Sequence, residues 1–256
     1  MKIAHYTNIG KRQKNEDSLG FNKNCLIVCD GVGGAAFGEF VSSFVVKEIL
    51  KRTALERIKT ENDFERIIHE VQSKLNSLVI EDENLNGAAT TIAVIYMSKN
   101  GLFTFHMGDT RIIIVRNSKF WQTWDHSVVS EMVKLGELNQ KDIKQHPLRN
   151  QITRAVIANS DDKKRKPEVN FLSDIQKGDI GFICSDGVLE VFSEQELLFL
   201  LGSRKMSIDD KLIQIRTRCK ELSDDNNTAI IVEFDDNDVK YFSNYPTKWK
   251  NIDSIS

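Results

Sequence analysis

Short apolar runs that end on an acidic residue recur along the chain. Runs of this length, rich in β-branched and aromatic residues, are typical of buried strands. An unpaired carboxylate at the end of a buried strand is costly, so such an acid should meet a cation or face an opening. The pairs of run and acid are Cys25–Cys29 with Asp30, Phe103–Met107 with Asp109, Ile180–Cys184 with Asp186 and, with the acid in front, Asp225 with Ala229–Val232.

Two long segments show the three- and four-residue spacing of apolar positions that predicts amphipathic helices. They are Phe37–Lys59 and Asp63–Ile80. His69 lies beside the apolar stripe of the second segment, which indicates a packing or surface residue rather than a ligand. Two further helices should follow Ser193 and Ser207, because an acid stands three positions after each serine and completes a capping box.

The rest of the chain alternates strand and turn patterns. Residues 88–124 predict an antiparallel meander with a tight hairpin at Asn100-Gly101. In that meander His106 alternates with apolar neighbours and is interpreted as a satisfied strand histidine. Strands in two groups, with helices in pairs, predict an α+β domain. Weaker strand patterns occupy residues 1–9, 152–157 and 239–242.

Composition limits the partners and the compartment. The chain has 256 residues, 40% hydrophobic, and a net charge of −2. This suits one large domain or two small ones, and a single basic block at Lys163–Lys166 disfavours nucleic acid as a partner. The four cysteines have no C-x-x-C spacing and lie in apolar patterns, which predicts buried thiols in a reducing compartment. We expect no signal peptide and no membrane association, because no apolar run approaches membrane-spanning length.

The acids at the strand ends become informative if the fold brings them together. Clustered carboxylates repel one another unless divalent cations hold them. Sites with only oxygen ligands suit the hard ions Mg²⁺ and Mn²⁺. One aspartate-glycine pair after a strand is more often a simple turn, so it is the repetition of the pattern that favours a metal centre.

Seven short motifs follow one another along most of the chain. They are Arg12-x-x-Asn15-Glu16-Asp17, Asp30-Gly31-x-Gly33-Gly34, Gly87-x-x-Thr90-Thr91, Gly108-Asp109-x-Arg111, Asp125-His126-Ser127, Ser185-Asp186-Gly187 and Asp225-Asn226-x-Thr228. Each motif alone has many chance matches. In this order they resemble the metal-dependent serine/threonine phosphatases of the protein phosphatase 2C family, in its bacterial form.

The resemblance implies a fold and a domain division. The expected α+β fold has two antiparallel β-sheets packed as a central sandwich, flanked on both sides by pairs of α-helices, in four αββα layers. Residues 1–245 would form a single catalytic domain and residues 246–256 a C-terminal tail. Within the domain, residues 126–150 would form a flap beside the active site, and the helical pattern of residues 128–135 lies in it. His126, at the start of the flap, has either a structural or a chemical role.

The resemblance also implies a set of metal ligands. Asp30 would bridge two divalent ions, Mn²⁺ or Mg²⁺, and the Gly31 carbonyl would bind one of them. Asp186 and Asp225 would bind the other. A hydroxide shared by the two ions would then attack phosphorus, so no nucleophilic cysteine is expected.

Three residues near the N-terminus would complete the catalytic set. Arg12 would bind the substrate phosphate, for which the planar fork of guanidinium donors is well suited. Glu16 and Asp17 would orient waters bound to the metal ions. A solvated, charged loop is the alternative interpretation of this segment.

Two differences from the family's motifs, and one acid without an assigned role in the two-metal site, leave alternatives open. Val32 stands where many relatives have a histidine that is a proposed proton donor, so the general acid is not identified. Asp109 would either help Asp186 hold a third, weaker ion or form an ion pair with Arg111. Glu190 stands near the position where several relatives have a shorter polar partner for such an ion, and it either reaches that ion or misses it.

The function implied is the metal-dependent hydrolysis of phosphoserine and phosphothreonine in proteins. The expected partners are phosphoprotein substrates and a cognate serine/threonine kinase with its targets, in the cytoplasm, and the chain is expected to be a monomer. Two alternatives remain: a binding module that kept the fold without the chemistry, and a two-metal hydrolase of nucleotides or other small phosphoesters.

Overall fold

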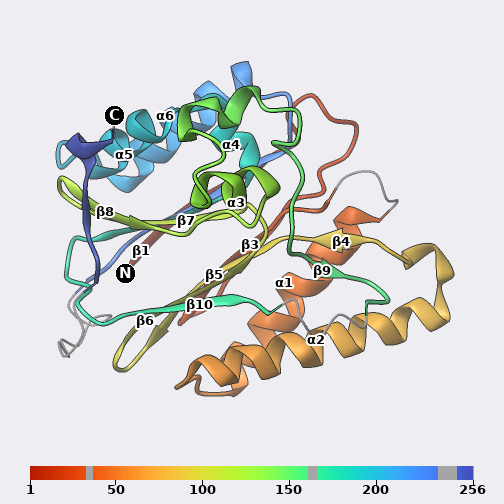
Figure 1. Ribbon diagram of the computed structural model, residues 1–256. Coiled ribbons are helices and arrows are strands. Elements are labelled where there is room, and N and C mark those ends of the chain that lie inside the picture. Colours follow the sequence, from red (N-terminus) through yellow and green to blue (C-terminus); the bar gives the residue numbers. More distant parts are fainter. Residues whose placement is uncertain (33–36, 161–165, 236–246, 256) are drawn as a thin grey trace.

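The computed structural model describes residues 1–32, 37–160, 166–235 and 247–255 (Figure 1). Its strands are β1 (Lys2–Asn8), β2 (Ser18–Phe21), β3 (Cys25–Cys29), β4 (Ala89–Thr90), β5 (Ile92–Ser98), β6 (Gly101–Met107), β7 (Arg111–Arg116), β8 (Lys119–Gln122), β9 (Val156–Ile157), β10 (Glu168–Leu172), β11 (Ile180–Cys184), β12 (Asn227–Glu233) and β13 (Lys250–Asn251). Its helices are α1 (Gly38–Leu55), α2 (Glu61–Glu81), α3 (Val128–Lys134), α4 (Asp186–Val191), α5 (Glu194–Gly202) and α6 (Ile208–Leu222), with 3-10 turns η1 (Glu83–Leu85), η2 (Gln140–Gln145) and η3 (Ile252–Ser254).

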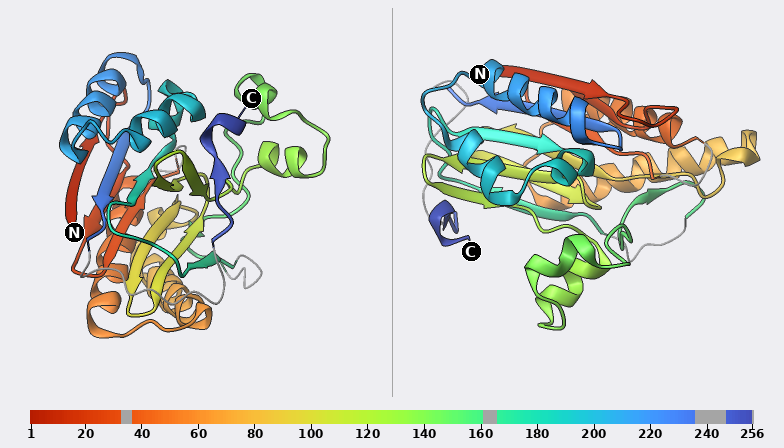
Figure 2. Two further views of the ribbon diagram at one scale, coloured as in Figure 1. Left: turned by 90° about the vertical axis from the view of Figure 1, so that its left-hand side faces the viewer. Right: turned by 90° about the horizontal axis from the view of Figure 1, so that it is seen from above.

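Two antiparallel sheets form the centre of the molecule (Figure 2). One has six strands in the order β1-β12-β11-β7-β8-β13, and the other has five in the order β10-β6-β5-β3-β2. Helices α1 and α2 cover the five-stranded sheet, and α4, α5 and α6 cover the six-stranded sheet. The predicted four-layer α+β sandwich is therefore confirmed. Among the described residues, no helix has both the length and the apolar character needed to cross a membrane.

The apolar runs are continuous because the inner strands are buried on both faces. In β3, Cys25, Ile27 and Cys29 pack against α1 and α2. The alternate residues Leu26 and Val28 pack into the layer between the two sheets. Strands β11 and β12 divide their side chains in the same way between that layer and the helices α4 to α6. The four cysteines are buried free thiols, as predicted.

Most predicted helix boundaries agree with the structure, and the capping boxes at Ser193 and Ser207 are present. The end of α1 differs, because the helix stops at Leu55 instead of continuing to Lys59. Glu56 adopts an extended conformation, and Ile58 turns into the core with only 3% of its surface exposed. The burial of Ile58 therefore overrides the helical periodicity of this segment.

Other segments differ from the sequence patterns or extend them. Of the strand predicted at residues 152–157, Val156–Ile157 pairs with β4, and Ile152 forms an isolated bridge with Ser127. Lys250–Asn251, in the predicted tail, pairs with β8 at the edge of the six-stranded sheet. The strand predicted at residues 239–242 lies outside the described residues. Helix α4 was not predicted, because its six residues begin with the Asp186-Gly187 pair that the sequence presents as a turn.

Candidate metal centre

Antiparallel pairing places the acid-bearing strand ends at one end of the sandwich, where the strands begin or finish. The last residue of β11, Cys184, pairs with Ala229 near the start of β12 and with Arg111 at the start of β7. Asp186, Asp225 and Asp109 therefore lie just past the ends of neighbouring strands, on the same side of the six-stranded sheet.

The five-stranded sheet contributes two further acids to this place. Cys29, the last residue of β3, pairs with Ser18, the first residue of β2. Asp30 therefore follows β3 at the point where Asp17 precedes β2. Electrostatic coupling of Asp30 with Asp17, Asp186 and Asp109 links the two groups of acids into one acid cluster.

The acid cluster is under strong mutual repulsion. Burial, and then the charges of neighbouring acids, raise the pKa values of Asp30 and Asp186 well above their usual range. Burial also raises the pKa of Asp17 to about 6, and burial with the nearby charge of Asp125 raises the pKa of Asp109 to about 7. Without cations, these carboxyl groups are pushed toward their neutral forms.

A chain of hydrogen bonds from two strand ends positions Asp17. Its Oδ2 accepts a hydrogen bond of 2.7 Å from the Ser185 hydroxyl, and that hydroxyl accepts one of 3.0 Å from the Thr228 amide. Its other oxygen, Oδ1, is buried and has no hydrogen-bond partner within the described part of the chain. A buried carboxylate oxygen in this state is a site where a water or a cation is needed.

Two threonines hold the main chain at Asp30. The Asp30 amide donates to the Thr91 hydroxyl at 3.0 Å, and its carbonyl accepts from the Thr91 amide at 2.8 Å and from the Thr90 hydroxyl at 2.9 Å. The Thr91 hydroxyl also lies 2.5 Å from that of Thr110, the neighbour of Asp109. The Gly87-x-x-Thr90-Thr91 motif thus fixes the strand end that carries Asp30.

Close backbone packing brings Asp225 to Asp186. Gly187 lies directly against the Asn226 carbonyl oxygen, so any side chain at position 187 would overlap that oxygen. The Asn226 side chain accepts from the Glu16 amide at 2.8 Å and donates to the carbonyls of Ile9 and Lys14 at 2.8 and 2.9 Å. Asn226 therefore joins the Asp225 turn to the loop that carries Arg12 and Glu16. Through these contacts of its side-chain amide, Asn226 is part of the site. In the sequence it appeared only as one position of the Asp225-Asn226-x-Thr228 motif.

Arg12 lies at the rim of the acid cluster and forms a two-point ion pair with Asp225. The distances are 2.8 Å from Nε to Oδ1 and 2.6 Å from Nη2 to Oδ2. Arg12 is more than half exposed, so its guanidinium faces solvent as well as the acids. Arg12, the candidate residue for binding phosphate, and Asp225, a candidate metal ligand, are thus bound to each other in this structure.

The structure shows the partners of Arg111 and Glu190, which the sequence left open. Arg111 forms its ion pair with Asp125, at 3.0 Å from Nε to Oδ1 and 2.5 Å from Nη2 to Oδ2, rather than with Asp109. Glu190 accepts hydrogen bonds from the Ser223 hydroxyl and the Asp224 amide at 3.1 and 3.2 Å. Glu190 therefore supports the loop before Asp225.

The acid cluster fits divalent cations. Its candidate ligand atoms are all oxygens, supplied by carboxylates and the Gly31 carbonyl, which matches the preference of Mg²⁺ and Mn²⁺. The raised pKa values and the unpartnered oxygen of Asp17 both indicate missing positive charge.

Comparisons with known proteins agree with this arrangement. A family profile described as Protein phosphatase 2C matches residues 6–209. The serine/threonine phosphatase stp of Listeria welshimeri is 30% identical over 237 residues, which are 87% of this chain and 91% of that relative.

Solved structures share the fold. The crystal structure of the serine/threonine phosphatase Stp1 from Staphylococcus aureus superposes with a TM-score of 0.82 at 26% identity, covering 91% of this chain and 95% of that one. The catalytic domain of PstP, in complex with two manganese ions, gives a TM-score of 0.79 at 23% identity over 91% of this chain and 97% of that one, which shows the common fold. From the extent of the profile match and the identity to stp, the chain belongs to the protein phosphatase 2C family.

Proposed function

We propose that the chain hydrolyses phosphoserine and phosphothreonine in proteins, with divalent cations held by the acid cluster. The observation that carries this proposal is the convergence of five aspartates from separate strand ends, with an arginine at their rim and with the pKa values of Asp30 and Asp186 raised well above their usual range. This combination suits a phosphate ester, because the cations and the arginine would together offset its negative charge.

Each residue has a proposed task. Asp30 and the Gly31 carbonyl, with Asp186 and Asp225, would hold two cations. Bound cations of this kind acidify water into a nucleophile and neutralise phosphate charge. Side chains of the protein would bind the phosphate and orient the water.

Arg12 would donate its fork of hydrogen bonds to the phosphate oxygens, and Glu16 and Asp17 would orient water. Asp109 would support a third, weaker cation beside Asp186. Val32 offers no proton, so a water would protonate the leaving group.

The proposal also covers the identity of the metal, the extent of the domain, the oligomeric state and the location. Mn²⁺ is favoured by the manganese complex of PstP, and Mg²⁺ remains compatible with an all-oxygen site. We propose one catalytic domain over residues 1–245, acting as a monomer on the targets of a cognate kinase. A cytoplasmic location is supported by four buried free thiols.

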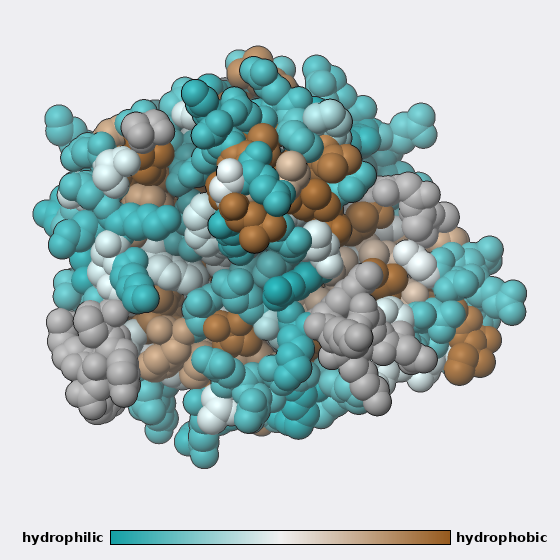
Figure 3. All heavy atoms as spheres, in the orientation of Figure 1, coloured by the Kyte–Doolittle hydropathy of each residue, from teal (hydrophilic) through white to brown (hydrophobic). Residues whose placement is uncertain are grey.

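The flap of residues 126–150 carries α3 and η2, and apolar side chains gather over it on the face shown in Figure 3. Leu135, next to α3, is 73% exposed. We propose that this surface contacts the peptide around the phosphorylated residue.

A substrate panel tests the proposal. Phosphate release should be measured with Mn²⁺ on matched phosphothreonine, phosphoserine and phosphotyrosine peptides, a nucleotide and a small aryl phosphate. We expect the highest kcat/KM on the phosphothreonine or phosphoserine peptide. A preference for the nucleotide would indicate a hydrolase of small phosphoesters, and no release from any substrate would indicate a binding module.

A further inference from the structure

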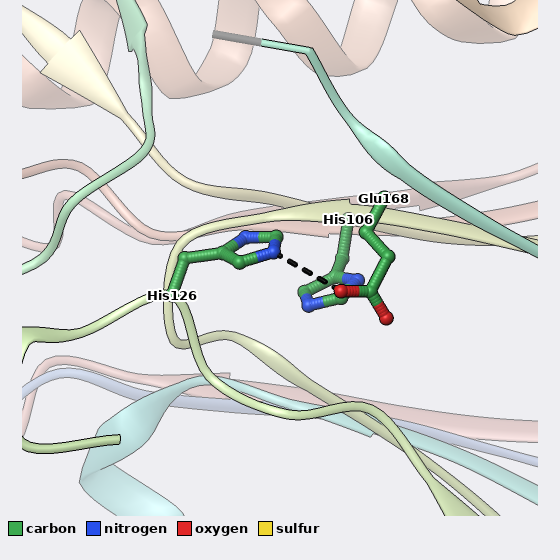
Figure 4. A group of neighbouring side chains, drawn as sticks. All are labelled: His106, His126 and Glu168. Atoms are coloured by element: carbon green, nitrogen blue, oxygen red, sulfur yellow. Dashed lines mark ion pairs between the residues drawn. The ribbon is translucent and has the colours of Figure 1, made fainter. Parts of the chain in front are cut away.

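Two buried histidines and a partly exposed glutamate lie together near the Gly108-Asp109 turn, outside the acid cluster (Figure 4). His106 comes from β6 and is fully buried, and His126, 3% exposed, precedes α3. Their rings are nearly parallel, with an angle of 6° and a centroid distance of 4.3 Å. The Glu168 carboxylate, from β10, lies 3.4 Å from Nε2 of His126.

Backbone partners fix the tautomer of each histidine. Nε2 of His106 lies 2.9 Å from the Trp124 carbonyl oxygen, which can only accept, so this nitrogen carries the proton. Nδ1 of His126 accepts from the Gly108 amide at 3.3 Å, so it carries the lone pair. In neutral His126 the proton therefore sits on Nε2, which lies 3.4 Å from the Glu168 carboxylate without a hydrogen bond to it.

This arrangement argues against a metal site at the three side chains, although their ligand atoms lie within 4.8 Å of one another. A neutral imidazole binds a metal through the nitrogen that has no proton. In His126 that nitrogen is already bound to the Gly108 amide. Moreover, rings in parallel planes do not direct their in-plane lone pairs at a single ion.

The same contacts bracket Asp109 on both sides. Before it, the His126 amide donates to the Gly108 carbonyl at 2.9 Å, while the Gly108 amide donates to the His126 ring. After it, Arg111 is held by the two-point ion pair with Asp125, the neighbour of His126. Asp109 and Thr110 thus lie between two anchor points on one short segment.

We infer that His126 is a positioning residue, whose Nδ1 fixes the Gly108-Asp109 turn so that the Asp109 carboxylate faces the acid cluster. The stacked ring of His106 and the carboxylate of Glu168 hold the imidazole in the orientation that presents Nδ1 to the Gly108 amide. This inference rests on the proposed function, because it gives Asp109 a part in metal-dependent turnover.

Two substitutions at position 126 separate this role from simple packing. The oxygen of an asparagine side chain can occupy the place of Nδ1, whereas leucine fills similar space without an acceptor. His126→Leu should lower kcat with Mn²⁺ on a phosphothreonine peptide by about tenfold, the effect typical of one lost buried hydrogen bond. His126→Asn should recover most of that loss, and His69→Leu, on the exposed surface of α2, is the matched control and should have no effect. An asparagine variant as impaired as the leucine variant would overturn the inference.

A double-mutant cycle shows whether His126 acts through Asp109. In an Asp109→Asn background, which should itself lower kcat, adding His126→Leu should change kcat by less than about twofold, because the positioned group is already gone. Independent, multiplying effects of the two substitutions would overturn the inference. So would an Asp109→Asn protein that turns over like the wild type.

Calorimetric titration with Mn²⁺ needs no substrate and therefore separates the inference from the proposed function. His126→Leu should weaken the weakest Mn²⁺ binding step about tenfold relative to wild type, His126→Asn should not, and thermal unfolding checks that each variant is folded. If wild type hydrolyses no phosphopeptide but this pattern of binding appears, the proposed function fails and the positioning role stands. Equal Mn²⁺ binding in wild type and a folded His126→Leu variant would overturn it.

Discussion

Arg12 has two candidate partners that it cannot satisfy together. Its guanidinium makes a two-point ion pair with Asp225 in this structure, yet the same fork of donors is the proposed ligand of the phosphate. A divalent cation at Asp225 would compete with the guanidinium for the carboxylate. Binding of a cation at Asp225 is therefore expected to release Arg12 from its ion pair and make it available to the phosphate.

Replacing Arg12 with alanine should have two opposite effects. The KM for a phosphothreonine peptide should rise about tenfold, since a charged two-point contact with phosphate is lost. The Mn²⁺ affinity should increase, because a competing cation has been removed from Asp225. Peptide kinetics and calorimetry measure these effects separately. Lys11→Ala, which breaks the neighbouring exposed ion pair with Asp224, is the control. Weaker Mn²⁺ binding in Arg12→Ala would instead mean that Arg12 organises the acids.

At the residue scale, the sequence indicates the acids but not their supports. Asp30, Asp109, Asp186 and Asp225 are visible because each stands just beyond one end of an apolar run. The partners of Arg111 and Glu190 could not be predicted, because they depend on which loops meet across the fold. Sequence proximity suggested Asp109 for Arg111, whereas the turn before the flap supplies Asp125.

At the scale of elements, the short helix α4 joins two of the candidate ligands. It begins with Asp186 and packs through Gly187 against the turn that carries Asp225. Gly187→Ala should force α4 away from that turn, with a loss of roughly 1–3 kcal/mol of stability and most of the activity.

Gly178→Ala is the matched control for this change. Its Cβ would meet open space, but its φ of +81° still imposes a cost of about 1 kcal/mol on a non-glycine residue. Denaturant unfolding and turnover should therefore separate the two variants, since only the first should lose activity. An active Gly187→Ala protein would show that α4 and the Asp225 turn can move apart harmlessly.

The flap is attached to α4 through one lysine. Nζ of Lys144, in η2, donates to the carbonyls of Leu189 and Phe192 at 3.2 and 3.3 Å, at the C-terminal end of α4. Lys144→Met keeps the length of the side chain but removes these bonds. We expect a KM change of about threefold on peptides, in line with the modest energy of exposed hydrogen bonds, and none on a small aryl phosphate. Equal changes on both substrates would place the effect in the acid cluster.

Element positions were the most predictable part of the fold. The apolar runs, helical patterns and capping boxes give the inner strands and five of the helices, α3 included, because period and caps are local properties. The end of α1 and the existence of α4 depend on where Ile58 and Gly187 pack, and such tertiary contacts are not local. The packing of two sheets face to face was expected only through the family resemblance, and the strand order was not predicted.

For the whole molecule, repulsion within the acid cluster should make stability depend on pH when no metal is bound. A raised carboxyl pKa means that the folded state holds the proton more tightly, so stability is lost as pH rises through that pKa. The pKa of Asp109 is about 7, so this group alone should lower the free energy of unfolding by roughly 0.8 kcal/mol between pH 6.5 and 8.

His106 opposes this decline only in part. Burial lowers its pKa to about 4, so it is neutral in the folded state throughout the range, whereas the unfolded imidazole is half protonated at pH 6.5 and nearly neutral at pH 8. Its contribution raises the free energy of unfolding by roughly 0.4 kcal/mol over this range, which is less than the fall caused by Asp109. Urea unfolding in the presence of a chelator should show the decline, and excess Mn²⁺ should abolish it. Stability that rises across this range without metal would contradict the picture of a strained acid cluster.

The most direct measurement is to count bound Mn²⁺ and phosphate release on the same samples of wild type and Asp30→Asn. Wild type should bind at least two ions and release phosphate from a phosphothreonine peptide only when they are bound. Asp30→Asn should remain folded, with metal-free stability equal to or above that of wild type, because one repelled carboxylate is gone, and should lose bound metal and most turnover. Wild-type turnover that persists in excess chelator, or an Asp30→Asn variant that turns over normally at saturating Mn²⁺, would contradict a catalytic metal centre at these strand ends.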